Sequence, residues 1–470
     1  MAKSNQITLF NTMSRSKELF VPHDPNNVSL YSCGLTVYDE PHIGNWSTYI
    51  AWDLLVRVLR DADYNLNHVQ NYTDVGHLIS DEDAGEDKMV SAARKSRKTA
   101  WEVADHYIER AELGMQVLNI TRPTHMPRAT QYIDQQITFV KQLENKGFTY
   151  IIANEGVYFD SSKLDDYGKL ARLDIAGLRS GERVDDTGKK NITDFALWKF
   201  SPIDEKRDME WTSPWGKGFP GWHLECSVMS QELLGESIDI HTGGIDHIPV
   251  HHTNEIAQSE ALTGRDFVKY WLHRNFIKVD GNKMSKSLGN FYTLDDLQAK
   301  GFDPLDFRML IMQSSYHTES NFSWETLSAA RQRRLGLQSF ADLRFQTNTS
   351  GISAQEIMTT TAQMQTSLRD DLNSPEALAL LSQLESKASE NGIHKDAEAD
   401  AFVSWLDSLF GLGLSDSGDI TLDQKNIISQ RADARLHKDW AASDKLREQL
   451  AADTIEVRDT SIGQFWNRNN

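Results

Sequence analysis

The chain has 470 residues, of which 39% are hydrophobic and 25% are charged, a composition typical of a folded protein with more than one domain. No apolar run approaches the roughly 20 residues of a membrane helix. Residues 1–20 lack the continuous apolar segment of a signal peptide, so we expect a cytoplasmic protein that does not enter a membrane. The formal net charge of −19 argues against unspecific binding to nucleic acid, although residues 420–470 hold as many basic as acidic residues and would repel a polyanion least.

The chain contains only two cysteines, Cys33 and Cys226. A disulfide framework is not expected in a large chain without a secretion signal. Two buried thiols that pack as small hydrophobic groups are the simplest interpretation, and a metal site is the alternative.

The first long helix follows a short strand and begins with polar residues. Residues 28–32 predict a strand that ends at Cys33, and an apolar pattern with helical spacing begins after His42 and Asn45. The N–H groups and the dipole of a helix N-terminus favour an anion, which indicates a nucleotide site. Capping of the helix by Asn45 is the simpler alternative.

We expect a second strand at residues 66–72 and helices at residues 99–118 and 128–146. Strands at residues 150–160 and 194–200 belong to a less regular region, which we interpret as an insertion. Beyond the insertion, helices and strands alternate again. A helix opens at residues 221–226, a strand covers 237–241, a helix runs over 251–263, and a strand covers 276–279.

This alternation predicts a Rossmann-like, doubly wound parallel sheet, whose ligands bind at the carboxyl ends of the strands. The residues that follow predicted strands are therefore expected to face one crevice: Cys33, His42, Thr73, His241, Asp246 and residues 283–287.

The last of these segments, Lys283-Met284-Ser285-Lys286-Ser287, places two ammonium groups and two hydroxyls within five residues, with glycines on either side. Such a loop can close over a polyphosphate, because lysine supplies charge and serine supplies hydrogen bonds. A solvated basic turn is the simpler alternative.

The rest of the chain predicts an all-α region that ends in a short strand. Helices are expected at residues 324–346, 354–372, 375–391, 402–410 and 424–451, with a polar linker over 415–422 and a strand over 455–457.

His251 and Glu255 stand four residues apart, which places both on one face of a helix. Together with Cys33 and Cys226 they make a set of two sulfur, one nitrogen and one oxygen ligands that suits zinc. A surface pair of His251 and Glu255 is the alternative. Structural zinc is usually held by local cysteine pairs, so ligands this distant in sequence indicate a metal that faces a substrate.

Taken together, these stretches resemble the cysteinyl-tRNA synthetase family of class I aminoacyl-tRNA synthetases. The resemblance rests on a zinc cysteine with its following residues (33–39) and on a HIGH-type signature (42–45) with Asn45 in last position. It also rests on three zinc and pocket motifs (220–226, 239–246 and 251–258) and on a KMSKS loop (283–287). One departure is His247-Ile248-Pro249-Val250, where the family more often has Phe-Pro directly before the paired histidines.

The resemblance implies that cysteine and ATP form cysteinyl-adenylate and pyrophosphate, and that the cysteinyl group then passes to the 3′ end of tRNA-Cys. It implies that the chain binds L-cysteine, ATP with Mg²⁺ and tRNA-Cys, and one Zn²⁺ that selects the thiol. We expect a monomer. The implied zinc ligands are Cys33, Cys226, His251 and Glu255. The implied catalytic residues are His42, Asn45, Lys283 and Lys286, which would contact ATP together with Gly44, Ser285 and Ser287. The implied cysteine pocket consists of Gly34, Thr36, Thr73, Trp222, His241 and Asp246.

The expected domain organisation places the two halves of the catalytic domain at residues 1–119 and 206–290, around a connective insertion at 120–205. A linker of the stem-contact type (291–338), a helical bundle (339–412) and an anticodon-binding domain (413–470) follow. An ATP-dependent cysteine ligase of the mycothiol type, which joins cysteine to an amino sugar, and a zinc-binding relative without catalysis remain alternatives. The basic clusters at residues 94–98 and 331–334 could contact RNA phosphates or be solvated helix faces.

Overall fold

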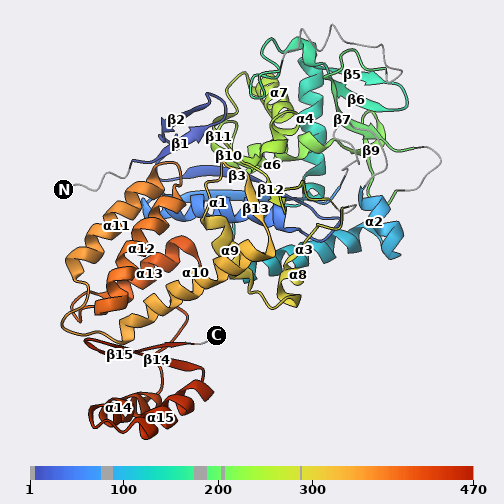
Figure 1. Ribbon diagram of the computed structural model, residues 1–470. Coiled ribbons are helices and arrows are strands. Elements are labelled where there is room, and N and C mark those ends of the chain that lie inside the picture. Colours follow the sequence, from blue (N-terminus) through green and yellow to red (C-terminus); the bar gives the residue numbers. More distant parts are fainter. Residues whose placement is uncertain (1–5, 76–87, 174–187, 203–206, 286–287, 469–470) are drawn as a thin grey trace. The chain divides into compact units, whose positions relative to one another are not determined.

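The computed structural model describes residues 6–75, 88–173, 188–202, 207–285 and 288–468 (Figure 1). The chain divides into two compact units. Unit 1 comprises residues 1–278, 282–296 and 316–320, and unit 2 comprises residues 279–281, 297–315 and 321–470. None of the described helices combines the length and the apolar character that a membrane crossing requires.

Unit 1 is built on a four-stranded parallel sheet with the order β11-β10-β3-β4. Its strands are β3 (Val28–Thr36), β4 (Leu66–Thr73), β10 (Ile238–Gly244) and β11 (Val268–Arg274). Strand β3 is central and almost wholly buried, as expected for a parallel strand covered on both faces. The predicted Rossmann-like sheet is confirmed.

Helices follow the strands of this sheet. Helix α1 (Ile43–Asp61) packs against β4 and β10, and α6 (Trp222–Leu234) packs against β3 and β4. Helix α7 (His251–Thr263) packs against α6 and ends at Gly264 in the left-handed conformation (φ 70°). Two further helices, α2 (Lys88–Ser96) and α3 (Ala100–Val117), pack against each other.

A second sheet of unit 1 is antiparallel and has the strand order β5-β6-β7-β9-β8. Its strands are β5 (Thr149–Ile152), β6 (Gly156–Phe159), β7 (Phe195–Phe200), β8 (Trp211–Ser213) and β9 (Gly216–Pro220). Helix α4 (Ile133–Asn145) shares a hydrophobic core with this sheet and with α6 and α7. The expected insertion boundary at residue 205 lies between β7 and β8.

Four further short strands form two separate pairs, and they correct the sequence analysis. An unpredicted hairpin of β1 (Thr8–Asn11) and β2 (Ser16–Leu19) packs against β11. The predicted strand before the lysine-serine loop exists as β12 (Ile277–Val279). It pairs with β13 (Ser320–Phe322) and does not join the parallel sheet, whose edge is β11. The expectation that this loop directly follows a strand of the parallel sheet was therefore wrong.

Unit 2 is mostly helical. Its helices, with α8 at the border of the two units, are α8 (Leu294–Ala299), α9 (Pro304–Met312), α10 (Trp324–Asp342), α11 (Ala354–Arg369), α12 (Ser374–Asn391), α13 (Ala399–Phe410), α14 (Leu422–Leu436) and α15 (Trp440–Ala452). The chain ends in a hairpin of β14 (Ile455–Thr460) and β15 (Gly463–Arg468), which shares a small core with α15.

The single helix predicted over residues 424–451 was wrong. Lys438 adopts a left-handed conformation (φ 60°) that breaks it into α14 and α15. Asp439 then caps α15 by accepting a hydrogen bond from the Ala442 N–H at 3.0 Å. The apolar pattern continues across the break, so periodicity alone indicated one helix.

Candidate functional site

A cleft of about 640 Å³ lies at the carboxyl ends of the parallel strands of unit 1. Each of the four strands contributes residues to its lining, as a doubly wound sheet predicts: Cys33, Gly34 and Thr36 from β3, Asn71 and Thr73 from β4, Gly243 and Gly244 from β10, and Arg274 from β11. Five of the six residues predicted for the cysteine pocket line this cleft: Gly34, Thr36, Thr73, Trp222 and Asp246.

The start of α1 forms one wall of the cleft. The Nδ1 atom of His42 accepts hydrogen bonds from the N–H groups of Gly44 (3.0 Å) and Asn45 (3.4 Å), and Asn45 Oδ1 accepts from the His42 N–H (3.0 Å). Because Nδ1 is an acceptor, a neutral His42 carries its proton on Nε2 and can donate it to a ligand.

We expected free N–H groups at the start of α1 to bind an anion, but the first N–H groups of this helix already donate hydrogen bonds within the protein. The N–H of Ile43 donates to the Tyr292 carbonyl (2.9 Å), and those of Gly44 and Asn45 donate to His42. Side chains, rather than these amides, are therefore the groups that α1 offers to a phosphate.

The lysine-serine loop reaches the same wall. Lys283 and Met284 line the cleft, and a Cβ atom on Gly44 would lie 2.7 Å from His42 Cε1 and 2.8 Å from Met284 Cε, so a side chain at position 44 would displace these groups. Asn290 holds the loop by accepting from the Ser285 N–H (2.8 Å) and donating to the Lys283 carbonyl (3.1 Å). The predicted contacts of Lys286 and Ser287 lie outside the described residues.

The four predicted metal ligands converge at this cleft. Cys33 comes from β3, Cys226 from α6, and His251 and Glu255 from successive turns of α7. One ligand atom of each lies within 4.8 Å of those of the other three, and His251 Nε2 is 3.0 Å from Glu255 Oε1. Both cysteines are free thiols.

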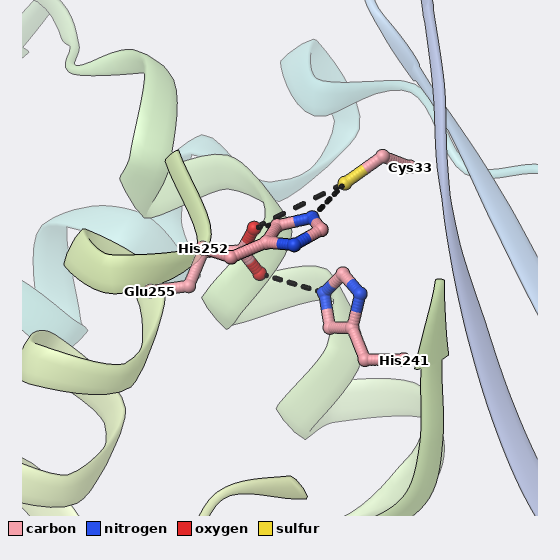
Figure 2. A group of neighbouring side chains, drawn as sticks. All are labelled: Cys33, His241, His252 and Glu255. Carbon is pink, nitrogen blue, oxygen red and sulfur yellow. Dashed lines mark hydrogen bonds and ion pairs between the residues drawn. The ribbon is translucent and has the colours of Figure 1, made fainter. Parts of the chain in front are cut away.

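A second group of potential ligands shares Cys33 and Glu255 and adds His241 and His252 (Figure 2). His252 Nε2 lies 3.3 Å from Cys33 Sγ, and His241 Nε2 lies 2.9 Å from Glu255 Oε2. The other ring nitrogen of His252 contacts His273 at 2.7 Å. His241 is fully buried behind Glu255, so this residue, predicted for the cysteine pocket, does not line the cleft.

The electrostatics of the cluster suit a cation. Contact with Cys33 lowers the pKa of Cys226 to about 6, although burial opposes the shift. Burial acts against the charged form of Glu255 as well, but His241 and His251 hold the pKa of this carboxyl well below its usual value. Burial would lower the pKa of His251, yet Glu255 and Cys226 raise it to about 10. The donor set, two sulfurs with one nitrogen and one oxygen, and these buried anions both fit a zinc ion.

Two contributors to the site were missed in the sequence. Asn71 Oδ1 accepts a hydrogen bond from the Gly34 N–H at 2.9 Å, and a Cβ atom on Gly34 would lie 1.4 Å from the Asn71 carbonyl oxygen. Arg274 lines the cleft from the end of β11. Asn71 lies inside a predicted strand and Arg274 inside a strand that was not predicted, so neither carried a motif that marks a ligand site.

Solved structures with a similar fold include aminoacyl-tRNA synthetases. Methionyl-tRNA synthetase of Mycobacterium tuberculosis in complex with methionyl-adenylate matches 83% of the chain and 93% of its own length, with a TM-score of 0.62 and 13% sequence identity. This likeness shows that the chain has the fold of a class I aminoacyl-tRNA synthetase.

Sequence comparisons define the family. The family model of the tRNA synthetases class I (C) catalytic domain matches residues 19–332, and that of the cysteinyl-tRNA ligase anticodon binding domain matches residues 417–466. Cysteine--tRNA ligase 1 of Burkholderia lata is 44% identical over 97% of the chain and 96% of its own length. Cysteine--tRNA ligase of Treponema denticola is 39% identical over 98% and 99%. The chain belongs to the cysteine--tRNA ligase family.

Proposed function

We propose that the chain activates L-cysteine with ATP and transfers the cysteinyl group to the 3′ end of tRNA-Cys. In the first step a carboxylate oxygen of cysteine attacks the α-phosphorus of ATP and pyrophosphate leaves. In the second step a ribose hydroxyl of the terminal nucleotide attacks the carbonyl carbon and AMP leaves. The observation that supports the proposal best is the convergence of the cluster Cys33, Cys226, His251 and Glu255 with His42 and Lys283 on one cleft.

The residues of α1 and the lysine-serine loop would act on the phosphates. His42 donates from Nε2, and the Lys283 ammonium neutralises charge that develops on the departing pyrophosphate. Lys286, Ser285 and Ser287 are proposed to assist, and Asn45 holds His42 through its capping contact. Positioning and charge stabilisation dominate such a reaction, since the protein itself forms no covalent bond with the substrate.

Cys33, Cys226, His251 and Glu255 are proposed to hold one Zn²⁺. This ion would bind the substrate thiolate, a soft ligand that a serine hydroxyl does not replace. Selectivity at this point matters because cavity shape discriminates poorly between side chains that differ by one atom. Trp222, whose ring centroid lies 4.3 Å from that of His251, and Asp246, which can pair with the α-ammonium, would complete the pocket.

The proposal is tested by charging a tRNA-Cys transcript with labelled cysteine and ATP with Mg²⁺. We expect label on acid-precipitated RNA that depends on ATP and on the tRNA, and no comparable label from serine. A folded, metal-loaded protein that labels no RNA would contradict the proposal. The same reaction with an amino sugar in place of RNA tests the mycothiol-type alternative, which the match to an anticodon-binding domain disfavours.

A further inference from the structure

Arg274 is a buried cation that has no carboxylate partner among the residues that the structure describes. Its side chain is 1% exposed, and its protein contacts are two hydroxyls: Nη2 donates to Ser320 Oγ at 2.9 Å and Nε to Ser47 Oγ at 3.5 Å. Burial lowers the pKa of Arg274 to about 10, which leaves the guanidinium charged at neutral pH. An unpaired charge inside a protein is costly, so its retention needs a reason.

Two other arginines with little exposed surface pair with carboxylates instead. Arg57 donates to Asp53 at 2.7 Å, and Arg431 makes two hydrogen bonds of 2.9 Å with Asp459. Among the described residues, Nη1 of Arg274 has no hydrogen-bond partner. Two N–H groups of a charged side chain are thus available to something that enters the cleft, which Arg274 lines.

The position of Arg274 indicates which part of a ligand it meets. Arg274 ends the edge strand β11 beside Gly244, two strands away from the metal-ligand cysteine of β3, or about 10 Å at the usual strand spacing. Its partner Ser47 lies about one turn into α1, beyond the histidine and glycine at the helix start. Phosphates placed between the helix start and Lys283 would leave this end of the cleft for the nucleoside.

An aromatic surface lies at the same end. Phe276, two residues after Arg274, lines the cleft and is 50% exposed, unusual for a phenylalanine. A flat base can stack on such a ring, and an arginine beside it can donate to ring nitrogens of the base.

We propose that Arg274 is a specificity-determining residue that binds the adenine of ATP, with Nη1 donating a hydrogen bond to a ring nitrogen and Phe276 offering a stacking surface. The inference rests on the proposed function, because it takes ATP as the nucleotide of this cleft. Bound adenine would bring a hydrogen-bond acceptor to a guanidinium whose Nη1 has no such partner among the described residues.

The first test uses Arg274→Met, which keeps the length of the side chain and removes its donors. In cysteine-dependent ATP–pyrophosphate exchange, kcat/KM for ATP should fall roughly ten- to a hundredfold, as for a lost hydrogen bond from a charged group. The KM for cysteine and the metal content should stay near wild type. Lys278→Met is the matched control, since Lys278 lines the same end but pairs with Glu319 at 2.7 Å, and this variant should resemble the wild type. A folded Arg274→Met enzyme with wild-type kcat/KM for ATP, or with only its cysteine KM or its tRNA transfer step impaired, would overturn the inference.

The second test does not depend on the folding of a variant. Wild-type enzyme is assayed with the 1-deaza, 3-deaza and 7-deaza analogues of ATP, each of which replaces one ring nitrogen by carbon. At least one analogue should lose about tenfold or more in kcat/KM, and this loss should vanish in Arg274→Met. Three analogues that all behave like ATP in the wild type would contradict the proposal.

The experiments distinguish a failure of the proposed function from a failure of the role proposed for Arg274. A wild-type protein without cysteine-dependent exchange refutes the function, and calorimetric titration with ATP then tests Arg274 directly. Weaker ATP binding by Arg274→Met than by Lys278→Met supports the role of Arg274, and equal binding refutes it.

Discussion

The neighbouring histidines 251 and 252 allow the metal assignment to be tested with two matched substitutions. Both are buried in the first turn of α7, and both have Nε2 near Glu255 Oε1, at 3.0 and 3.9 Å. Structural zinc sites with four ligands bind with about 10–16 kcal/mol, so an average ligand contributes about 2.5–4 kcal/mol, or about two to three orders of magnitude in affinity. His251→Gln should therefore weaken zinc binding by this amount.

His252→Gln should have a smaller effect. In the proposed assignment, His252 contacts the ligand Cys33 at 3.3 Å and orients it without binding the ion, a role usually worth about 10- to 100-fold in metal affinity. Zinc affinity is measured by competition with a chromophoric chelator and zinc content by elemental analysis, with thermal melting as the control for folding. If His252→Gln lost the metal and His251→Gln kept it, the ion would instead belong to the second group of ligands, with His241 and His252 (Figure 2).

Three further predictions concern other parts of the molecule. Lys283→Ala should raise the activation free energy of ATP–pyrophosphate exchange by about 3 kcal/mol, which slows exchange roughly a hundredfold, while isothermal titration shows unchanged cysteine binding. Exchange at the wild-type rate would show that Lys283 has no role in the mechanism. Gly34→Ala should be destabilised by at least about 1–3 kcal/mol in chemical denaturation, because its Cβ atom would meet the Asn71 carbonyl at 1.4 Å; a fully stable variant would refute this packing. Arg431→Met should remove the paired hydrogen bonds to the partly exposed Asp459, cost about 1–3 kcal/mol, and lower tRNA charging in steady-state assays while pyrophosphate exchange persists; parallel loss of both activities would argue against separate roles of the two units.

The sequence predicted those parts of the fold whose signal is local. Strands β3 and β4 and helices α1 and α7 all have strong apolar patterns or clear end signals, such as Gly264 after α7. The metal cluster was predictable because the spacing of His251 and Glu255 fixes their relative position on any helix. The two distant cysteines were added because they complete a donor set that suits zinc, and the family resemblance then implied the same four ligands, although no local rule brings β3, α6 and α7 together.

The missed features depend on tertiary structure. Strand β11 is bounded by Phe267 and Asn275 without a glycine or proline that marks its ends, and its last residues, His273 and Arg274, are polar yet buried. The break at Lys438 places a non-glycine residue at positive φ, which sequence patterns rarely signal. Whether His252 contacts Cys33, or whether Arg274 finds a carboxylate, depends on which side chains meet after folding.

Buried charges of the described chain are handled differently in unit 2 and at the cleft. In unit 2, Arg334 donates to the buried Asp306 at 2.7 Å, and Arg431 donates from Nη1 and Nη2 to Asp459. At the cleft, Arg274 has only hydroxyl partners, and the cluster around Glu255 combines a carboxylate with low-pKa sulfur. Buried charge without a partner lowers the free energy of unfolding, so a fold keeps it only where something else supplies the counter-charge. The proposed metal ion would bring positive charge to the cluster, and the proposed adenine would bring a hydrogen-bond acceptor to Arg274 at the other side of the cleft. Binding of both ligands should therefore stabilise unit 1 more than the area they cover would suggest.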